Sequence, residues 1–183
     1  RDIREAFCTA REVGFACINM DLIAGLPQDS VEGFRDSLEE VLALRPENIT
    51  VHTLAMKKGS RLMEEGGALP SGEETGRMVD LSLEALEGAG YRPYYLYRQK
   101  YMSGGLENVS WCLPGTENHY NIIMMEELQS VLSLGAGGVT KLVDRSSGRI
   151  VRLTNPKYPH DYLAMSAKVL EQKDEILRFY REV

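Results

Sequence analysis

The sequence contains few cysteines, no long hydrophobic run and no excess of basic charge, and each absence excludes a class of protein. The three cysteines, Cys8, Cys17 and Cys112, form no CxxC or CxxxCxxC cluster, so this chain shows no zinc or iron–sulfur motif of its own. No apolar run reaches the roughly 18 residues that a membrane span requires. The net charge of -6 disfavours nucleic acid as a partner, because phosphate groups bind basic surfaces. We therefore expect a cytoplasmic protein with reduced thiols and no membrane span.

The remaining composition is that of a globular protein. Hydrophobic residues make up 43% and charged residues 26% of the 183 residues, which allows a buried core to form. The sequence begins with Arg, inside a stretch that is itself typical of a helix. We therefore expect this chain to be a fragment of a longer protein.

Hydrophobic periodicity predicts alternating helices and strands over the first hundred residues. The expected helices cover residues 2–13, 31–44 and 73–88, and the expected strands cover residues 15–24, 48–56 and 91–101. The first of these strands is apolar on both faces, as is typical of a parallel strand covered by helices. Successive units of this kind predict an α/β fold with a parallel sheet, and repeat as they do in a (βα) barrel.

The pattern changes after residue 101, where we place a domain boundary. Residues 102–118 are predicted to form a loop, and residues 120–129 fit no single element. A Gly-rich strand over 130–143, a turn, a strand over 149–153 and a helix over 160–181 follow. The prediction is a barrel region over 1–101 and a small α+β extension over 102–183.

An acid, Asp21, interrupts the apolar run of INMDLIAGLPQDS, residues 18–30. A buried carboxylate is tolerated where hydroxyl, amide or ammonium groups donate hydrogen bonds to it, and a ligand could supply those groups. A structural acid that caps a loop or pairs with an arginine is the alternative. Gly25 and Pro27 predict a turn after this strand, and Asp29 with Glu32 predicts a capping box for the next helix.

Other candidate residues lie at the ends of the later strands. Ligands of parallel α/β sheets bind where the strands end, so Ala55, Arg98 and Lys100 could face the same cleft as Asp21. Arg98 and Lys100 could contact the carboxylates of an acidic substrate, although a solvated strand end explains them equally well. We interpret His52 as a structural histidine. The GAGGV segment, residues 135–139, indicates close approach of the backbone either to another element or to a flat ligand.

Several longer segments together resemble a known family. AREVGF, INMDLIAGLPQDS and RPENITVHTLAM are similar to radical S-adenosylmethionine enzymes of the oxygen-independent coproporphyrinogen III oxidase family. YYLYRQKYM, ENVSWCLPG and YNIIMMEELQSVLSLGAGGVTKLV are more particular and resemble its HemZ-like branch, the coproporphyrinogen dehydrogenases. The resemblance covers nearly the whole chain.

The resemblance implies a fold and a cofactor site. The fold would be the C-terminal half of a partial (βα)6 TIM-like barrel, followed by the start of a C-terminal domain. Residues that contact S-adenosylmethionine in the family correspond to Asp21, Ala55 and Val139. The family's CxxxCxxC motif, which ligates a 4Fe–4S cluster, is absent from this chain, so the cluster would be held by residues outside it.

The implied reaction is the oxidative decarboxylation of propionates of coproporphyrinogen III to vinyl groups, giving protoporphyrinogen IX. A porphyrinogen would be the substrate, and a flavodoxin-type reductase or similar protein would supply electrons. The fragment alone is expected to be inactive and to self-associate through exposed barrel edges. The alternatives are a relative that binds and transfers haem, and an unrelated (βα) barrel enzyme that acts on small acidic substrates.

Overall fold

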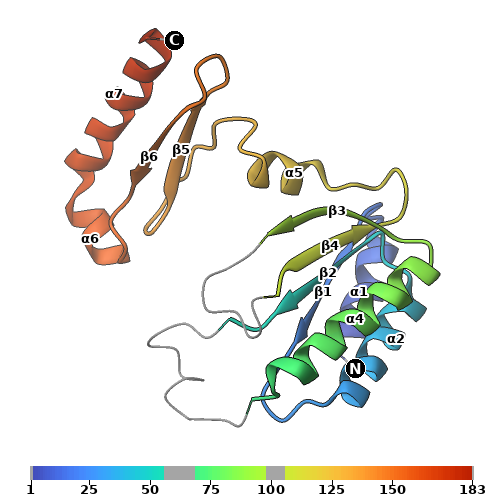
Figure 1. Cartoon of the computed structure of the whole chain (residues 1–183). Helices are drawn as coiled ribbons and strands as arrows, with labels where there is room; N and C mark the ends of the chain where they lie inside the picture. Colours follow the sequence, from blue (N-terminus) through green and yellow to red (C-terminus); the bar gives the residue numbers. More distant parts are fainter. Residues whose placement is uncertain (1, 56–68, 98–105, 183) are drawn as a thin grey trace. The chain divides into compact units, whose positions relative to one another are not determined.

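The computed structural model describes residues 2–55, 69–97 and 106–182, which belong to two compact units, Arg1–Asn118 and His119–Val183 (Figure 1). The first unit contains, in order, α1 (Asp2–Val13), β1 (Asn19–Ala24), α2 (Val31–Leu44), β2 (Asn48–Thr53), α4 (Gly72–Gly88), β3 (Arg92–Tyr97) and β4 (Asn108–Cys112). The second contains α5 (His119–Met125), β5 (Val139–Asp144), β6 (Arg149–Thr154), α6 (Pro159–Ala164) and α7 (Ser166–Glu182). The alternation of helices and strands expected for the first hundred residues is confirmed.

The first unit is built on a four-stranded sheet of order β1-β2-β4-β3. β1 and β2 are parallel, with Asp21 opposite Thr50, whereas β4 runs antiparallel to both of its neighbours. β1, β2 and β3 therefore run in the same direction, as expected of successive βα units, but the sheet is mixed because β4 separates β2 from β3.

The loop predicted for residues 102–118 is wrong in part, because residues Asn108–Cys112 form the strand β4. Its five residues, NVSWC, alternate between the two faces of the sheet, and both of its edges are hydrogen-bonded. Since β4 completes the sheet of the first unit, the division of the chain falls after Asn118, and not after residue 101 as the sequence suggested.

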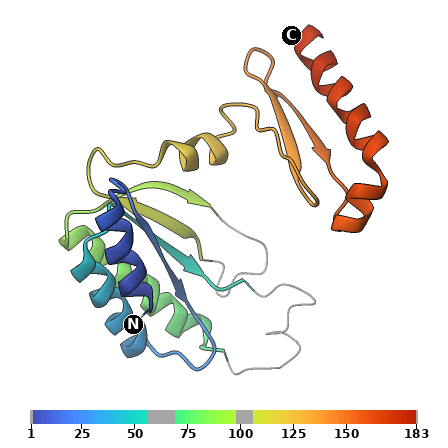
Figure 2. The ribbon, with the colours of Figure 1, turned by 180° about the vertical axis from the view of Figure 1, so that it is seen from behind.

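One face of this sheet carries the core of the unit. Figures 1 and 2 show α2 and α4 on the same side of the strands. The buried apolar side chains of this layer are Leu22, Ala24, Phe34, Leu38, Val41, Ile49, Val51, Met78, Leu86, Tyr91 and Trp111. Side chains alternate along a strand, so the residues between these positions point to the opposite face.

Local hydrogen bonds explain where the helices begin. The hydroxyl of Ser30 accepts a hydrogen bond from the backbone N of Gly33 at 3.1 Å, so Ser30 is the N-cap of α2. The predicted capping box of Asp29 is therefore wrong, and the Asp29 carboxylate accepts from the backbone N of Ser30 instead. Gly25 has a φ of 84°, which supports the predicted turn after β1.

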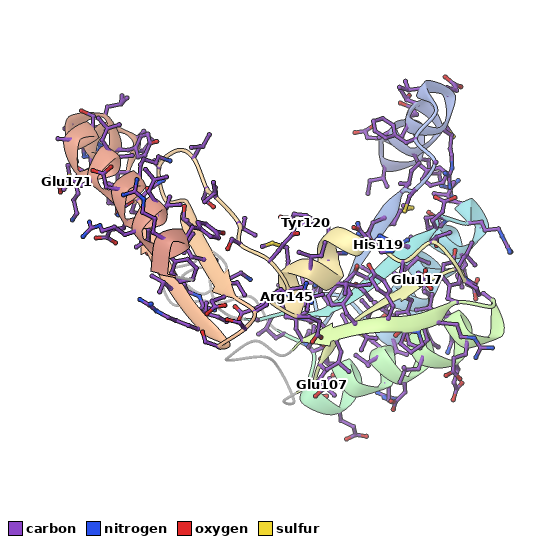
Figure 3. All side chains as sticks on the ribbon, turned by 90° about the horizontal axis from the view of Figure 1, so that it is seen from above. Glu107, Glu117, His119, Tyr120, Arg145 and Glu171 are labelled. Carbon is purple, nitrogen blue, oxygen red and sulfur yellow. The ribbon has the colours of Figure 1, made fainter. Side chains whose placement is uncertain are left out.

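The second unit is a β5–β6 hairpin packed against α7. Its buried apolar side chains include Leu142, Val169 and Phe179. Glu171 lies on the side of α7 that faces away from the hairpin (Figure 3). The strand expected over residues 149–153 is confirmed as β6, whereas the strand expected over 130–143 begins only at Val139, as β5. The helices α6 and α7 occupy the region of the last expected helix.

The GAGGV segment packs against its own unit. Asn155 donates from its side chain to the carbonyl of Gly135 at 2.9 Å, and its backbone N donates to the carbonyl of Gly138 at 2.9 Å. A Cβ on Gly138 would lie 3.0 Å from the Cβ of Ser133. Of the two meanings left open by the sequence, close approach to another element of the chain is therefore the one that the structure supports. No helix in the described parts of the chain is long and apolar enough to cross a membrane.

Candidate functional site

The face of the sheet that points away from α2 and α4 carries polar side chains from all four strands. Asn19 and Asp21 project from β1, and Thr50 and His52 project from the neighbouring β2. Ser110 of β4 lies directly opposite Thr50, with 2.7 Å between the two hydroxyl oxygens. In a (βα) barrel this face of the sheet is the interior, and the loops at its C-terminal end form the ligand site.

Asp21 is the acidic group of this face. It is the third residue of β1, and its side chain is 57% exposed. Oδ1 accepts a hydrogen bond from Nδ2 of Asn19 at 2.6 Å, and Oδ2 lies 3.5 Å from Nε2 of His52. His52 chiefly, with the Asn19 amide, lowers the pKa of Asp21 against the opposing effect of partial burial. Asp21 is therefore an ionised, oriented and accessible hydrogen-bond acceptor.

His52 contacts a second strand as well as Asp21. Its Nδ1 lies 3.1 Å from the hydroxyl of Tyr97 at the end of β3, and the imidazole is only 25% exposed. The hydroxyl of Thr50 donates to the side-chain oxygen of Asn19 at 3.1 Å, so the second neighbour of Asp21 is also held in place. Both oxygens of the Asp21 carboxylate thus face groups whose own positions are fixed by further contacts.

The other candidate residues have different positions. Ala55 follows β2 and is half-buried, and the backbone hydrogen bond from Leu54 to Ala24 continues the β1–β2 pairing to this point. Asp21 and Ala55 therefore come from two paired neighbouring segments. Val139 is the exposed first residue of β5 and belongs to the second unit. Arg98 and Lys100 lie outside the described residues.

Sequence reasoning singled out only Asp21 on this polar face, and it missed the contacts of His52 and Tyr97. His52 was interpreted as structural, and Tyr97 was not singled out. Asn19 and Asp21 are two residues apart, as are Thr50 and His52, so each pair occupies one face of its strand. That spacing could have indicated His52, but the contact with Tyr97 depends on the position of β4 between β2 and β3.

The residues of this chain fit the two expected cofactors differently. An exposed carboxylate with spare acceptor capacity fits a ligand that carries hydroxyl or ammonium groups, such as S-adenosylmethionine. Among the residues that the structure describes, no three histidine, cysteine or acidic side chains lie together in a group that could hold a metal ion. The three cysteines are free, and Cys112 is buried with its pKa raised to about 11 by that burial. An iron–sulfur cluster does not fit the residues of this chain.

Comparison with known proteins shows which proteins the chain is similar to. No family model matches the sequence. The chain is 39% identical over 98% of its length to the oxygen-independent coproporphyrinogen-III oxidase-like protein HemZ of Bacillus subtilis, and it spans 36% of that protein. Over nearly its whole length the chain is therefore similar to an oxygen-independent coproporphyrinogen III oxidase-like protein.

Other relatives match more distantly. The chain is 36% identical, over 49% of its length, to the oxygen-independent coproporphyrinogen III oxidase of Helicobacter pylori and spans 20% of it. It is 22% identical, over 96% of its length, to the heme chaperone HemW of Escherichia coli and spans 42% of it. The chain thus covers less than half of each of these relatives.

A solved structure supports the fold. Coproporphyrinogen III oxidase (HemN) from Escherichia coli, described as a radical SAM enzyme, superposes with a TM-score of 0.61 at 20% identity, covering 85% of this chain and 35% of that one. At this identity the likeness shows the fold alone. It confirms the α/β, TIM-like fold that the resemblance implied.

Proposed function

We propose that the chain is part of a radical S-adenosylmethionine coproporphyrinogen dehydrogenase of haem biosynthesis. The whole protein would convert propionate side chains of coproporphyrinogen III to the vinyl groups of protoporphyrinogen IX, with release of carbon dioxide. The single observation that carries this proposal is the polar face around Asp21, found in a chain that is 39% identical to an oxygen-independent coproporphyrinogen-III oxidase-like protein. An accessible ionised carboxylate on the interior face of a barrel sheet is suited to hold a polar cofactor.

The residues of this chain would bind and orient the cofactor. Asp21 would accept hydrogen bonds from donor groups of S-adenosylmethionine, which supplies the hydrogen-abstracting chemistry when bound. Ala55 is small enough to allow close approach, and Val139 offers an exposed apolar side chain for packing. The iron–sulfur cluster would be held by cysteines outside this chain, and Arg98 and Lys100 would contact the substrate carboxylates.

Further properties of the whole protein belong to the same proposal. An electron donor such as a flavodoxin-type reductase would deliver the reducing equivalents that radical SAM chemistry requires. The free thiols are compatible with a cytoplasmic location. Among the described residues, β1 pairs only with β2, so its other edge offers unpaired backbone groups through which the isolated chain would self-associate.

One further function is favoured by a specific observation. The match to the heme chaperone HemW of Escherichia coli extends over 96% of this chain. A protein of that kind would bind haem and would not decarboxylate a porphyrinogen. Titration of the full-length protein with haem, next to an assay with coproporphyrinogen III, separates the two functions because only the oxidase forms protoporphyrinogen IX.

The binding site itself is tested by S-adenosylmethionine affinity. Asp21→Asn in the full-length, cluster-reconstituted protein removes the charge and is expected to raise the Kd by about tenfold or more, as for the loss of a hydrogen bond to a charged group. Asp29→Asn is the matched control, because Asp29 lies at the nearby turn and its carboxylate accepts a hydrogen bond from the backbone N of Ser30. An unchanged Kd for Asp21→Asn, measured by equilibrium dialysis, would overturn the proposed site.

A further inference from the structure

We propose that His52 is the positioning residue of the cofactor site, fixing the Asp21 carboxylate through a chain of contacts that ends at Tyr97. This inference rests on the proposed function of Asp21 and adds two residues to it. His52 and Tyr97 come from β2 and β3, which are separated by β4. The chain of contacts therefore runs across the sheet from β1 to β3, and it ties the orientation of the Asp21 carboxylate to side chains of β2 and β3.

The geometry assigns the proton on His52. A carboxylate can only accept hydrogen bonds, so the ring nitrogen that faces it must carry a hydrogen. Nε2 is the nitrogen that faces Asp21, at 3.5 Å from Oδ2. In a neutral ring Nδ1 is then an acceptor, and the hydroxyl of Tyr97, 3.1 Å away, is the group that can donate to it. Tyr97 thus selects the tautomer of His52 that serves Asp21.

The arrangement orients Asp21 without using up its acceptor capacity. Oδ1 is held by the Asn19 amide at 2.6 Å, and Oδ2 faces the imidazole. An ionised carboxylate has about four acceptor positions, so positions remain on both oxygens for donor groups of a ligand. The 3.5 Å separation is long for a hydrogen bond, and catalytic and binding contacts of this kind commonly tighten when the ligand is bound.

Affinity measurements on the full-length, cluster-reconstituted protein test the proposal with S-adenosylmethionine as the probe. His52→Ala is expected to raise the Kd by about fivefold to tenfold, because Asp21 loses the partner that orients it. His52→Gln, whose amide N–H can replace Nε2–H, should stay within about threefold of the original protein, and Tyr97→Phe should give an intermediate value. His160→Ala is the matched control, because His160 also lies beside an aspartate, at 3.1 Å, but on the surface of the second unit.

A double-mutant cycle separates positioning from direct contact. If His52 acts through Asp21, His52→Ala has no further effect on the Kd in the Asp21→Asn background. If the increases in Kd caused by His52→Ala and Asp21→Asn instead multiply in the double variant, His52 contacts the cofactor independently, and the inference is overturned. An effect of Asp21→Asn without any effect of His52→Ala would overturn the inference alone, whereas no effect of Asp21→Asn would overturn the proposed function as well.

The tautomer supplies a readout that does not depend on binding. Nitrogen-15 NMR of histidine-labelled full-length protein should show His52 protonated at Nε2, and Tyr97→Phe should increase the fraction protonated at Nδ1. This measurement also covers the case in which His52→Ala fails to fold, since Tyr97→Phe removes only one oxygen. An Nδ1-protonated His52 in the original protein would contradict the assignment.

Discussion

The carboxylate of Glu47 joins Arg11 of α1 to the segments that lead into β1 and β2, and the substitution Glu47→Gln tests how much this contributes to stability. Nη2 of Arg11 lies 2.7 Å from both oxygens of Glu47, and the backbone N of Ile18 donates to Oε2 at 2.9 Å. The side chains of Arg11 and Glu47 are 31% and 17% exposed, so water screens this pair only in part. Glutamine keeps the size of the side chain but removes the charge and replaces one acceptor oxygen with a donor.

The expected loss follows from these contacts. A hydrogen bond to a charged group contributes about 1.5–3 kcal/mol. In the glutamine variant an amide oxygen at the Oε2 position can keep the contacts with Ile18 and Arg11, but it loses the charge and the second contact with Arg11. After a discount for the partial exposure of Arg11, we expect Glu47→Gln to lower the free energy of unfolding by about 2 kcal/mol. Glu40→Gln is the matched control, because Glu40 lies 2.6 Å from Arg4 but both side chains are more than half exposed. That variant should lose less than about 0.5 kcal/mol.

The pH dependence gives a second, independent signature. Burial raises the pKa of Glu47. The hydrogen bonds from Arg11 and from the backbone of Ile18 lower it by more, so the pKa of Glu47 is below its usual value. A depressed folded-state pKa adds stability above the unfolded pKa of about 4.3, and this stability is lost as the pH falls through the folded pKa. The difference between the original chain and Glu47→Gln should therefore be complete at neutral pH and shrink below about pH 4.

Urea unfolding followed by tryptophan fluorescence measures this difference. Trp111 is the single tryptophan of the 183 residues and is 1% exposed within the first unit, so its emission reports the unfolding of that unit. Equal losses for Glu47→Gln and Glu40→Gln, or a difference that persists unchanged at low pH, would refute the reasoning.

Three other properties of the chain can be tested by separate measurements. Cys112 is 1% exposed, and burial raises its pKa to about 11. In the folded chain it should therefore resist iodoacetamide at pH 8, while the exposed Cys8 reacts. Equal labelling of both cysteines, measured by mass spectrometry, would contradict this packing. Gly138→Ala should destabilise the second unit by about 1–3 kcal/mol in thermal unfolding, because the new Cβ would lie 3.0 Å from the Cβ of Ser133. Gly76→Ala in α4 is the control and should be neutral or stabilising, because a Cβ there would have no atom within 4 Å. Anaerobic reconstitution of the 183-residue chain should leave it without stoichiometric iron and sulfide, because it has no CxxxCxxC motif, and a stoichiometric cluster would disprove this expectation.

The long amphipathic and apolar segments were predictable from the sequence because their signals are local. The helical spacing of apolar residues locates α1, α2 and α4, and the β-branched run NITVHT locates β2. β4 was missed because its five residues lie between Gly-rich and Pro-rich segments and its pairing is with strands distant in the sequence. The N-cap of α2 was misplaced by one residue because Asp29 and Ser30 are both good capping residues.

The candidate site could be predicted only in part, for the same reason. Asp21 was identified because an acid inside an apolar strand is unusual in itself. His52 became significant only when the parallel register placed it beside Asp21, and Tyr97 only when β4 proved to separate β2 from β3. The roles of Ala55 and Val139 came from the resemblance to the family and stay predictions, since apolar side chains carry no chemistry that identifies a ligand.

The measurement that tests the central claim most directly is product analysis after anaerobic turnover. The full-length protein, with its cluster reconstituted, is incubated with coproporphyrinogen III, S-adenosylmethionine and a chemical reductant, and the products are separated by liquid chromatography. The proposed function predicts protoporphyrinogen IX, with a much lower yield for Asp21→Asn at limiting S-adenosylmethionine and an unchanged yield for Asp29→Asn. Stoichiometric haem binding without any vinyl product would contradict it.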